Sequence, residues 1–273
     1  MLIRAHHLNI DGRIGLVQDV EPEQPNGVVL LLVHTAGQSG VQWRSTLAPL
    51  SARGYRVLVP DLPGHGHSEP ASSGAVTDLR EYTDWLVAVL DALAIDRVVI
   101  VGCSIGGKIS QDLAGRHPDR VSGGIAMCAE PGPGRVQLKP LYRELEDSAA
   151  PSRSDRTFMG TLAVIGSAVD PARGELIARM HCREDPLVST SDLIGWGTLD
   201  IRPMLAGITC PFLFVAGEDD VWVDANAVAS AAAVVPGAEF ILIEQHGHYP
   251  MEEIVDFADV LHGWLEKLNV AVA

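Results

Sequence analysis

Residues 97–111, with the sequence RVVIVGCSIGGKISQ, decide the fold that we expect for this chain. The run 98–101 is apolar and β-branched, which is typical of a strand buried on both faces of a sheet. It leads directly into Gly102-Cys103-Ser104-Ile105-Gly106, and a segment compatible with a helix follows to about residue 116. A Gly-x-Ser-x-Gly motif between a strand and a helix is typical of a sharp, strained turn that exposes the serine hydroxyl.

The residues around Ser104 fit a nucleophile on such a turn. Gly102 and Gly106 stand where a Cβ would collide with the neighbouring strand or helix. The backbone N–H of Ile105, at the start of the helix, would point to the place where an oxyanion develops. The sequence therefore predicts a reactive Ser104, and an ordinary turn serine is the alternative interpretation of the same motif.

Length, charge and composition limit the classes of protein that this chain can belong to. Its 273 residues, 47% of them hydrophobic, suffice for one large α/β domain with an insertion or for two modest domains. The net charge of −15 argues against a nucleic-acid partner. No apolar run approaches the roughly 20 residues that cross a bilayer, and the first residues lack the apolar region of a signal peptide. The four cysteines show no paired spacing, which indicates free thiols in a reducing compartment: Cys103, Cys128, Cys182 and Cys210. We therefore expect a cytoplasmic protein, and the lack of a long apolar run predicts no membrane association.

Strand and helix patterns alternate along most of the chain. The strands that we expect are 2–8, 13–19, 28–33, 56–60, the run before Ser104, 123–129, 210–217 and 239–244. The helices that we expect are 42–53, 78–93, the segment after Ser104, 225–235 and 254–268. This alternation predicts an α/β fold with a mostly parallel central sheet flanked by helices on both faces.

The alternation stops at Pro131-Gly132-Pro133-Gly134, and no strong strand pattern returns before about residue 206. Segments 140–148, 156–169 and 173–181 are predicted to be short helices. We therefore expect an α/β core made of residues 1–130 and 207–273, with residues 131–206 inserted as a helical lid. The sequence shows no internal repeat and no low-complexity tract.

Candidates for the base and the acid follow late strands. A serine hydroxyl is a weak nucleophile unless a base takes its proton and an acid holds that base in place. Gly217-Glu218-Asp219-Asp220 ends one predicted strand, and Gln245-His246-Gly247-His248 ends the next. The carboxyl ends of adjacent parallel strands meet at one edge of a sheet. Asp219, Asp220 and Asp224 thus compete for the acid, and His246 and His248 compete for the base.

Taken together, these motifs resemble the α/β-hydrolase superfamily, in the branch that carries a lid between core strands. The resemblance covers nearly the whole chain and includes Trp43 nine residues after His34, DLPGHGHS at 61–68, RHPDRV at 116–121, GEDD at 217–220 and Gly247-His248. It implies Ser104 as nucleophile, Asp220 as orienting acid and His248 as general base. It also implies the N–H groups of Ile105 and Ala36 as oxyanion donors, and it requires no cofactor and no metal.

The chain departs from the family pattern at Thr35, where the family usually has glycine. A β-branched residue there can shift the Ala36 N–H or add a hydroxyl to the oxyanion hole. We interpret His34 as a structural residue of this loop, Asp61 as an acceptor that stabilises its own loop, and Cys103 as a packing residue.

Other side chains have competing interpretations. Trp196, Trp222 and Met180 either wall an apolar substrate pocket, together with Thr35, or belong to the core. Lys108 and Arg116 are expected to be solvated. Arg153, Arg156 and Arg183 either meet a substrate carboxylate or form a wet surface. His65, His67, His246 and His248 could together hold a metal, although no cysteine or carboxylate cluster completes the usual spacing.

The expected reaction is hydrolysis of a carboxylic ester or lactone of a small apolar substrate through an acyl-enzyme. The serine argues against the haloalkane dehalogenase and epoxide hydrolase relatives, which use an aspartate as nucleophile. Alternatives are a carbon–carbon bond hydrolase of ring-fission products (vinylogous diketones), a cofactor-free perhydrolase, and a non-catalytic ligand-binding protein on the same fold. The carbon–carbon hydrolases often have Asn where this chain has Cys103. The expected partner is a small molecule with a carbonyl, and the sequence is compatible with a homodimer.

Overall fold

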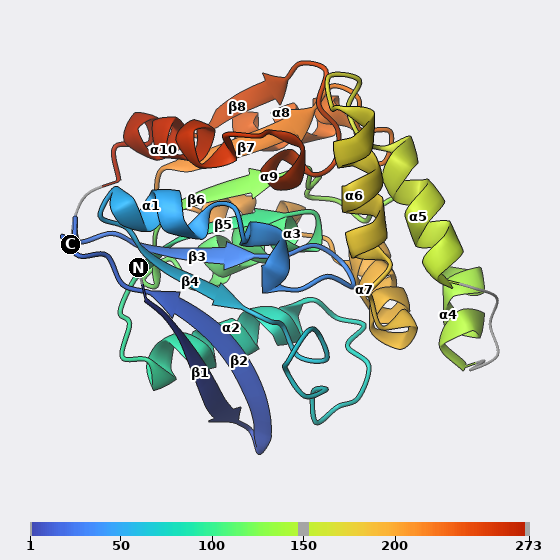
Figure 1. Ribbon diagram of the computed structural model, residues 1–273, viewed down its shortest axis with the longest axis horizontal. Coiled ribbons are helices and arrows are strands. Elements are labelled where there is room, and N and C mark those ends of the chain that lie inside the picture. The colour runs from blue at the N-terminus through green and yellow to red at the C-terminus, as the bar shows by residue number, and fades with distance from the viewer. Residues whose placement is uncertain (1, 147–152, 271–273) are drawn as a thin grey trace.

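One eight-stranded sheet organises the computed structural model, which describes residues 2–146 and 153–270 (Figure 1). The strands lie in the order β1-β2-β4-β3-β5-β6-β7-β8. Their bounds are β1 Ile3–Ile10, β2 Arg13–Val20, β3 Val29–Val33, β4 Arg56–Pro60, β5 Val98–Cys103, β6 Val121–Met127, β7 Phe212–Gly217 and β8 Glu239–Ile243. The pairs β1–β2 and β2–β4 are antiparallel, and the neighbouring pairs from β4 across to β8 are parallel. The predicted, mostly parallel sheet is confirmed.

Helices cover both faces of the sheet, which explains the apolar character of its central strands. All of β5 is buried, and its residues alternate between two cores: Ile100 packs on one face, and Val99 and Val101 pack on the other. The first face is covered by α2 Arg80–Ala92, α3 Ile105–Arg116 and α8 Ala225–Val234. The second is covered by α1 Leu47–Ala52 and α10 Phe257–Lys267. A strand buried on both sides needs apolar residues at every position.

Two predicted helices are shorter in the structure than expected, and each follows a separate short helical turn. Segment 42–53 contains part of a 3₁₀ turn, η1 Gly40–Trp43, and then α1. Pro49 lacks an N–H group and is tolerated in the first turn of a helix, so α1 begins just before it. Segment 254–268 corresponds to α10, and a short helix that the sequence did not predict, α9 Pro250–Glu253, precedes it. The Arg173 guanidinium binds the carbonyl oxygens of Glu252 and Ile254, which satisfies groups that a continuous helix would have used.

In the described residues between β6 and β7, four helices lie beyond the carboxyl ends of the central strands (Figure 1, right), and a 3₁₀ segment that packs on α3 follows them. They are α4 Leu138–Glu146, α5 Arg153–Ala163, α6 Pro171–His181, α7 Pro186–Thr198 and η2 Arg202–Gly207. We call α4 to α7 the helical insertion. The last residues of the predicted helix 140–148 lie outside the described residues, and the predicted helices 156–169 and 173–181 correspond to α5 and α6.

Helix α7 is missing from the sequence prediction. Its polar run at 189–192 and its two glycines, Gly195 and Gly197, give a weak helical pattern. The start of this helix does have a recognisable sequence, Asp185-Pro186. The Asp185 carboxylate accepts hydrogen bonds from the N–H groups of Leu187 at 2.8 Å and Val188 at 3.2 Å. An aspartate cap followed by proline is typical of a helix N-terminus. None of the helices within 2–146 and 153–270 has the length and apolar composition needed to cross a membrane.

Candidate active site

The backbone at Ser104 forms the strained turn that the motif predicts. Ser104 stands between β5 and α3 with φ of 58° and ψ of −120°, a conformation that residues other than glycine rarely adopt. A Cβ at Gly102 would lie 2.1 Å from the carbonyl oxygen of Gly106, and a Cβ at Gly106 would lie 2.5 Å from that of Val33. Glycine at both positions therefore allows the turn to pack against α3 and β3.

Asp220 and His248 are hydrogen-bonded to each other at the ends of neighbouring strands. Asp220 follows β7 and His248 follows β8, and Nδ1 of His248 lies 2.6 Å from Oδ2 of Asp220 with both side chains buried. The other oxygen of Asp220 accepts hydrogen bonds from the N–H groups of Trp222 at 2.9 Å and Val223 at 3.3 Å. Because Asp220 accepts the Nδ1 proton, the neutral ring presents the lone pair of Nε2.

The competing acids and base are engaged elsewhere. Asp219 accepts a hydrogen bond from the N–H of Ser167 at 2.7 Å. Asp224 caps α8 through the N–H of Asn226 at 2.9 Å. Nδ1 of His246 lies 2.9 Å from the carbonyl oxygen of Glu244. Among these candidates, in the part of the chain that the structure describes, Asp220 and His248 are the pair that is joined.

The loop of residues 34–38, which we call the oxyanion loop, has its amides fixed on either side of Ala36. The N–H of Thr35 donates to Oε1 of Gln42 at 2.9 Å, and the N–H of Gly37 donates to Oδ2 of Asp192 at 2.8 Å. The N–H of Ala36 has no hydrogen-bond partner among residues 2–146 and 153–270. The hydroxyl of Thr35 donates to Gln42 at 3.1 Å. Thr35, the residue that departs from the family pattern, is thus bound to Gln42 through both its N–H and its hydroxyl.

His34 and Asp61 have the structural roles that the sequence suggests. Nδ1 of His34 donates to the carbonyl oxygen of Thr35 at 2.9 Å, and Nε2 accepts the N–H of Leu62 at 3.1 Å. Burial and the nearby charge of His65 lower the pKa of His34 to about 4, so the ring is neutral and keeps this arrangement. Asp61 accepts hydrogen bonds from the N–H groups of Gly40 at 2.8 Å and His67 at 2.9 Å.

A cavity of about 300 Å³ joins Ser104 and His248 to the helical insertion. Its lining residues come from the sheet edge and from the insertion: Thr35, Ala36, Gln38, Ser104, Arg135, Val136, Arg156, Thr157, Gly160, Thr161, His181, Glu184, Ser189, Leu193, Trp196, Trp222, His248 and Tyr249. The Trp222 ring stands edge-on to the His248 ring, with their centroids 5.0 Å apart. The expected pocket residues Thr35, Trp196 and Trp222 line this cavity, whereas Met180 is absent from its wall.

Comparison with known proteins identifies the fold and the family. The model of the Alpha/beta hydrolase family matches residues 30–260. The chain belongs to this family. The enol-lactonase from Burkholderia xenovorans, at 21% identity, superimposes with a TM-score of 0.82 over 98% of this chain and 100% of its own, which shows the shared fold.

Two curated relatives are enzymes that cleave different bonds. One is a 2-hydroxy-6-oxononadienedioate/2-hydroxy-6-oxononatrienedioate hydrolase of Cupriavidus pinatubonensis, 30% identical over 243 residues that cover 82% of this chain and 81% of the relative. The other is a pimeloyl-(acyl-carrier protein) methyl ester esterase of Vibrio atlanticus, 27% identical over 257 residues that cover 88% and 95%. The chain is accordingly an enzyme of the alpha/beta hydrolase family.

The expectation that Lys108 is solvated is wrong. Lys108 of α3 is fully buried, and its Nζ donates to the carbonyl oxygens of Gly132 at 2.6 Å, Trp196 at 2.9 Å and Leu199 at 3.0 Å. Lys108 lies on the face of α3 that meets the chain at both ends of the insertion, and three carbonyl acceptors replace its water shell. Arg116 is half-buried and pairs with Asp112 and Asp84, each at 2.8 Å.

The arginines of the insertion divide between the cavity and its surroundings. Arg156 lines the cavity and pairs with Glu144 at 2.7 Å. Arg183 is not part of the cavity wall, and the side chain of Arg153 lies outside the described residues. The sequence analysis missed Arg135, which lines the cavity and pairs with Asp224 at 2.8 Å. Nothing in the segment around Arg135 signals this role.

The four histidines considered for a metal are not brought together. His65 lies against Asp192, His67 against Asp61, and His246 against a carbonyl. The group of potential ligands in the described chain is instead Cys128, Asp220 and His248, whose ligand atoms lie within 4.8 Å of one another. Asp220 and His248 are already bonded to each other, so a metal would have to break that bond.

The thiols near the histidine support its loop. Cys103 donates to the carbonyl oxygen of His248 at 3.1 Å, and Cys128 donates to that of Gly247 at 3.6 Å. Burial raises the pKa of Cys103, and the hydrogen bond that the Cys128 thiol donates to Cys103, together with burial, raises the pKa of Cys128. Both are therefore neutral packing thiols, as the sequence suggests for Cys103.

Proposed function

We propose that this family member hydrolyses a carboxylic ester or a lactone of a small apolar substrate through an acyl-enzyme. Ser104 is the nucleophile, His248 the general base and Asp220 the acid that orients it. The observation that carries the proposal is the strained Ser104 at the start of α3, facing the same cavity as the Asp220–His248 pair. This combination has the parts of a serine hydrolase site.

In the first half of the reaction, Oγ of Ser104 attacks the carbonyl carbon while its proton moves to Nε2 of His248. The carbonyl oxygen becomes an oxyanion, and the N–H groups of Ala36 and Ile105 donate to it. The tetrahedral intermediate then expels the alcohol, which takes the proton from His248. A water molecule attacks the acyl-enzyme in the same way, and its proton passes through His248 back to Ser104.

The helical insertion acts as a lid in this proposal. It contributes part of the cavity wall, in which Gly160, Leu193 and Trp196 stand beside polar residues such as Thr157 and Glu184. Water exclusion by such a wall strengthens the hydrogen bonds to the oxyanion. A cavity of about 300 Å³ is at the small end for ligand sites, which favours small substrates.

Fluorophosphonate labelling of the purified protein, with mass mapping of the modified residue, tests this proposal. We expect modification at Ser104, because only an activated serine attacks phosphorus at a useful rate. The label should be lost in Ser104→Ala and in His248→Ala and should persist in His246→Ala, the matched control outside the cavity. A folded wild-type protein that takes up no label would contradict the proposal.

A carbon–carbon bond hydrolase is the second candidate, since the relative at 30% identity is named for such dioate substrates. Arg135 and Arg156 favour it because they bring two guanidinium groups to the cavity. A substrate carboxylate would compete there with Asp224 and Glu144. If Ser104 is labelled, kcat/KM is measured on panels of esters and lactones and on a vinylogous diketone with a terminal carboxylate. A higher value on the esters or lactones favours the first function, and a higher value on the diketone favours the second.

A further inference from the structure

The oxyanion loop is held from two directions, by the core and by the helical insertion. On the core side, Gln42 accepts both the N–H and the hydroxyl of Thr35, and its own amide donates to Glu252 at 3.0 Å. On the insertion side, Asp192 of α7 accepts the N–H of Gly37, 155 residues away in the sequence. The Ala36 N–H lies between these two fixed amides.

Asp192 is a buried carboxylate with three donors. It has no exposed surface, and its oxygens accept hydrogen bonds from the N–H of Gly37 at 2.8 Å, from His65 at 2.8 Å and from the hydroxyl of Tyr82 at 2.7 Å. Two of the donors, His65 and Tyr82, belong to segments of the core that pack against α7. A buried carboxylate persists only where such partners offset its lost hydration.

His65 supplies the positive charge that balances Asp192. One ring nitrogen faces Asp192, and the other lies 3.1 Å from the carbonyl oxygen of Pro63 and 3.3 Å from that of Leu62. Both nitrogens thus face acceptors, which only the doubly protonated ring can satisfy. Burial alone would lower the pKa of His65, but the charge and hydrogen bond of Asp192 raise it. The Asp192–His65 ion pair is therefore a fixed anchor behind the oxyanion loop.

The second contact between the insertion and this loop involves Gln38. Its side-chain amide donates to the carbonyl oxygen of His181, the last residue of α6, at 3.1 Å. Two helices of the insertion thus hold consecutive residues of the loop, Gly37 and Gln38. The position of the insertion therefore affects the direction in which the neighbouring Ala36 N–H points.

We propose that Asp192 is a positioning residue for the oxyanion hole, so that the helical insertion completes the hole as well as walling the pocket. Asp192 touches no reacting atom and acts through the N–H of Gly37, which fixes the peptide next to the Ala36 donor. This inference rests on the proposed function, because it needs a reaction that forms an oxyanion. It assigns the insertion a contribution to kcat in addition to substrate binding.

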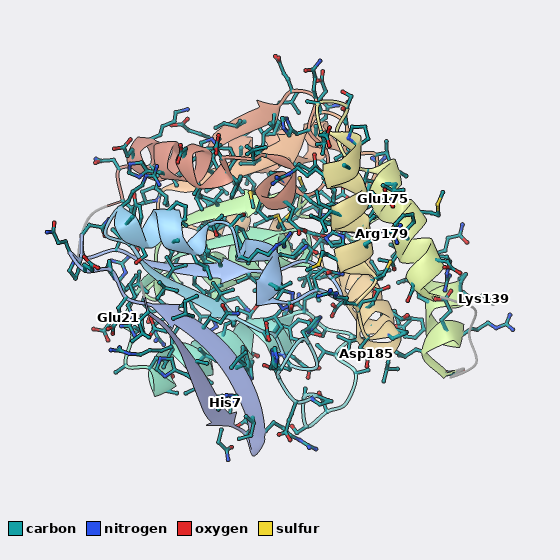
Figure 2. The ribbon with its side chains drawn as sticks, in the orientation of Figure 1. His7, Glu21, Lys139, Glu175, Arg179 and Asp185 are labelled. Atoms are coloured by element: carbon teal, nitrogen blue, oxygen red, sulfur yellow. The ribbon has the colours of Figure 1, made fainter. Side chains whose placement is uncertain are left out.

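The test compares Asp192→Leu, Asp192→Ala and Asp192→Asn with Asp185→Leu, a matched control on the same helix. Asp185 lies at the exposed start of α7 (Figure 2), and its carboxylate binds the N–H groups of Leu187 and Val188 in that helix. The readouts are the fluorophosphonate labelling rate, kcat and KM on p-nitrophenyl butyrate, affinity for a trifluoromethyl ketone that forms an oxyanion adduct with serine, and the melting temperature.

We expect Asp192→Leu and Asp192→Ala to lower kcat and ketone affinity by about 10- to 100-fold, since losing one oxyanion donor costs about 100- to 1,000-fold and here the donor is displaced. KM should change by less than about 3-fold, because the interaction is made in the transition state. Asp192→Asn keeps an acceptor for Gly37 and should recover most of kcat. Asp185→Leu should lower the melting temperature while kcat stays near the wild-type value.

A wild-type kcat and ketone affinity in folded Asp192→Leu would overturn the inference, and so would a change confined to KM. If the leucine variant does not fold, the smaller alanine decides by the same criteria. An equal fall in Asp185→Leu would reduce Asp192 to a stabiliser of α7. A wild-type protein that is not labelled refutes the proposed function and this inference together, whereas labelling at equal rates in wild type and Asp192→Leu refutes only the inference.

Discussion

At position 220 one carboxylate carries out two tasks that its neighbours do not share. Its Oδ1 accepts two backbone N–H groups, which fixes the side chain, and its Oδ2 accepts the Nδ1 proton of His248. Asp219, one residue earlier, points to Ser167 instead. The difference arises because successive residues at a strand end point in different directions, and only one of them faces the end of β8.

Asp220→Asn should therefore reduce activity far more than Asp219→Asn. An amide at position 220 can donate to Nδ1, which favours the tautomer with Nε2 protonated and unable to accept the serine proton. By analogy with other triads we expect kcat/KM to fall by about 10⁴-fold in Asp220→Asn and to change by less than about 3-fold in Asp219→Asn. Steady-state kinetics on one ester measure both, and similar losses in the two variants would contradict the assignment.

At the scale of the element, α3 contacts both the turn of Ser104, the proposed nucleophile, and the insertion. Its N-terminus carries the Ile105 N–H beside Ser104, and one turn later Lys108 binds carbonyl groups on both sides of the insertion, Gly132 before it and Leu199 after it. The Lys108 ammonium also lies 4.5 Å from the centre of the Trp196 ring. One helix thus connects the serine turn to both ends of the inserted segment.

Burial lowers the pKa of Lys108 to about 7, from an ordinary value of 10.5. Between these two values the unfolded chain holds a proton that the folded protein has released, so the stability contributed by Lys108 rises with pH from about 7 toward 10.5. The slope is at most about 1.4 kcal/mol per pH unit. The ammonium donates to all three carbonyl groups, and the neutral amine keeps two N–H donors. Lys108→Met lacks the pH dependence and removes every donor, at a cost of about 2 kcal/mol or more.

Denaturant unfolding of wild type and Lys108→Met at pH 7, 8 and 9 measures this effect. We expect the free-energy difference between the two proteins to widen as the pH rises. The exposed Lys139, which lies on the outer side of α4 (Figure 2), provides the control Lys139→Met. A difference that stays constant over these pH values would show that Lys108 keeps its proton in the folded protein.

At the scale of the whole molecule, the cavity exists only where the insertion meets the sheet edge. Ala36, Ser104 and His248 come from loops of the core, and Leu193 and Trp196 come from α7. Its size follows from the distance between these two parts. A small-molecule site usually combines apolar lining with a few polar groups, and this cavity places Leu193 and Trp196 beside polar residues such as Thr157 and Glu184.

This arrangement predicts selectivity for short acyl chains. In a series of p-nitrophenyl esters, kcat/KM should peak at acyl chains of about 2 to 6 carbons and fall for longer chains, because a cavity of about 300 Å³ cannot hold them. Leu193→Ala removes side-chain volume from the wall and should move the optimum toward longer chains. A wild-type preference for chains of about 12 carbons, or an unchanged optimum in Leu193→Ala, would contradict this description of the pocket.

The sequence by itself determined the alternation of buried strands and helices, the turn at Ser104, and the order in which this serine, the carboxylates after one late strand and the histidines after the next follow one another. Each of these features depends on neighbours within a few residues: a β-branched run, two glycines, or a carboxylate at a strand end. Such local patterns report the local backbone and the face on which a side chain lies.

Only the tertiary structure decided the burial of Lys108, the choice of Asp220 over Asp219 and the contact of Asp192 with Gly37. The partners in that last contact are 155 residues apart, and no spacing in the sequence links them. The helical sequence around a charged residue looks the same whether its side chain contacts water or a set of carbonyl groups from a distant part of the chain. Its energy depends on which groups the packed insertion brings to it, and that is settled when the distant parts of the chain come together.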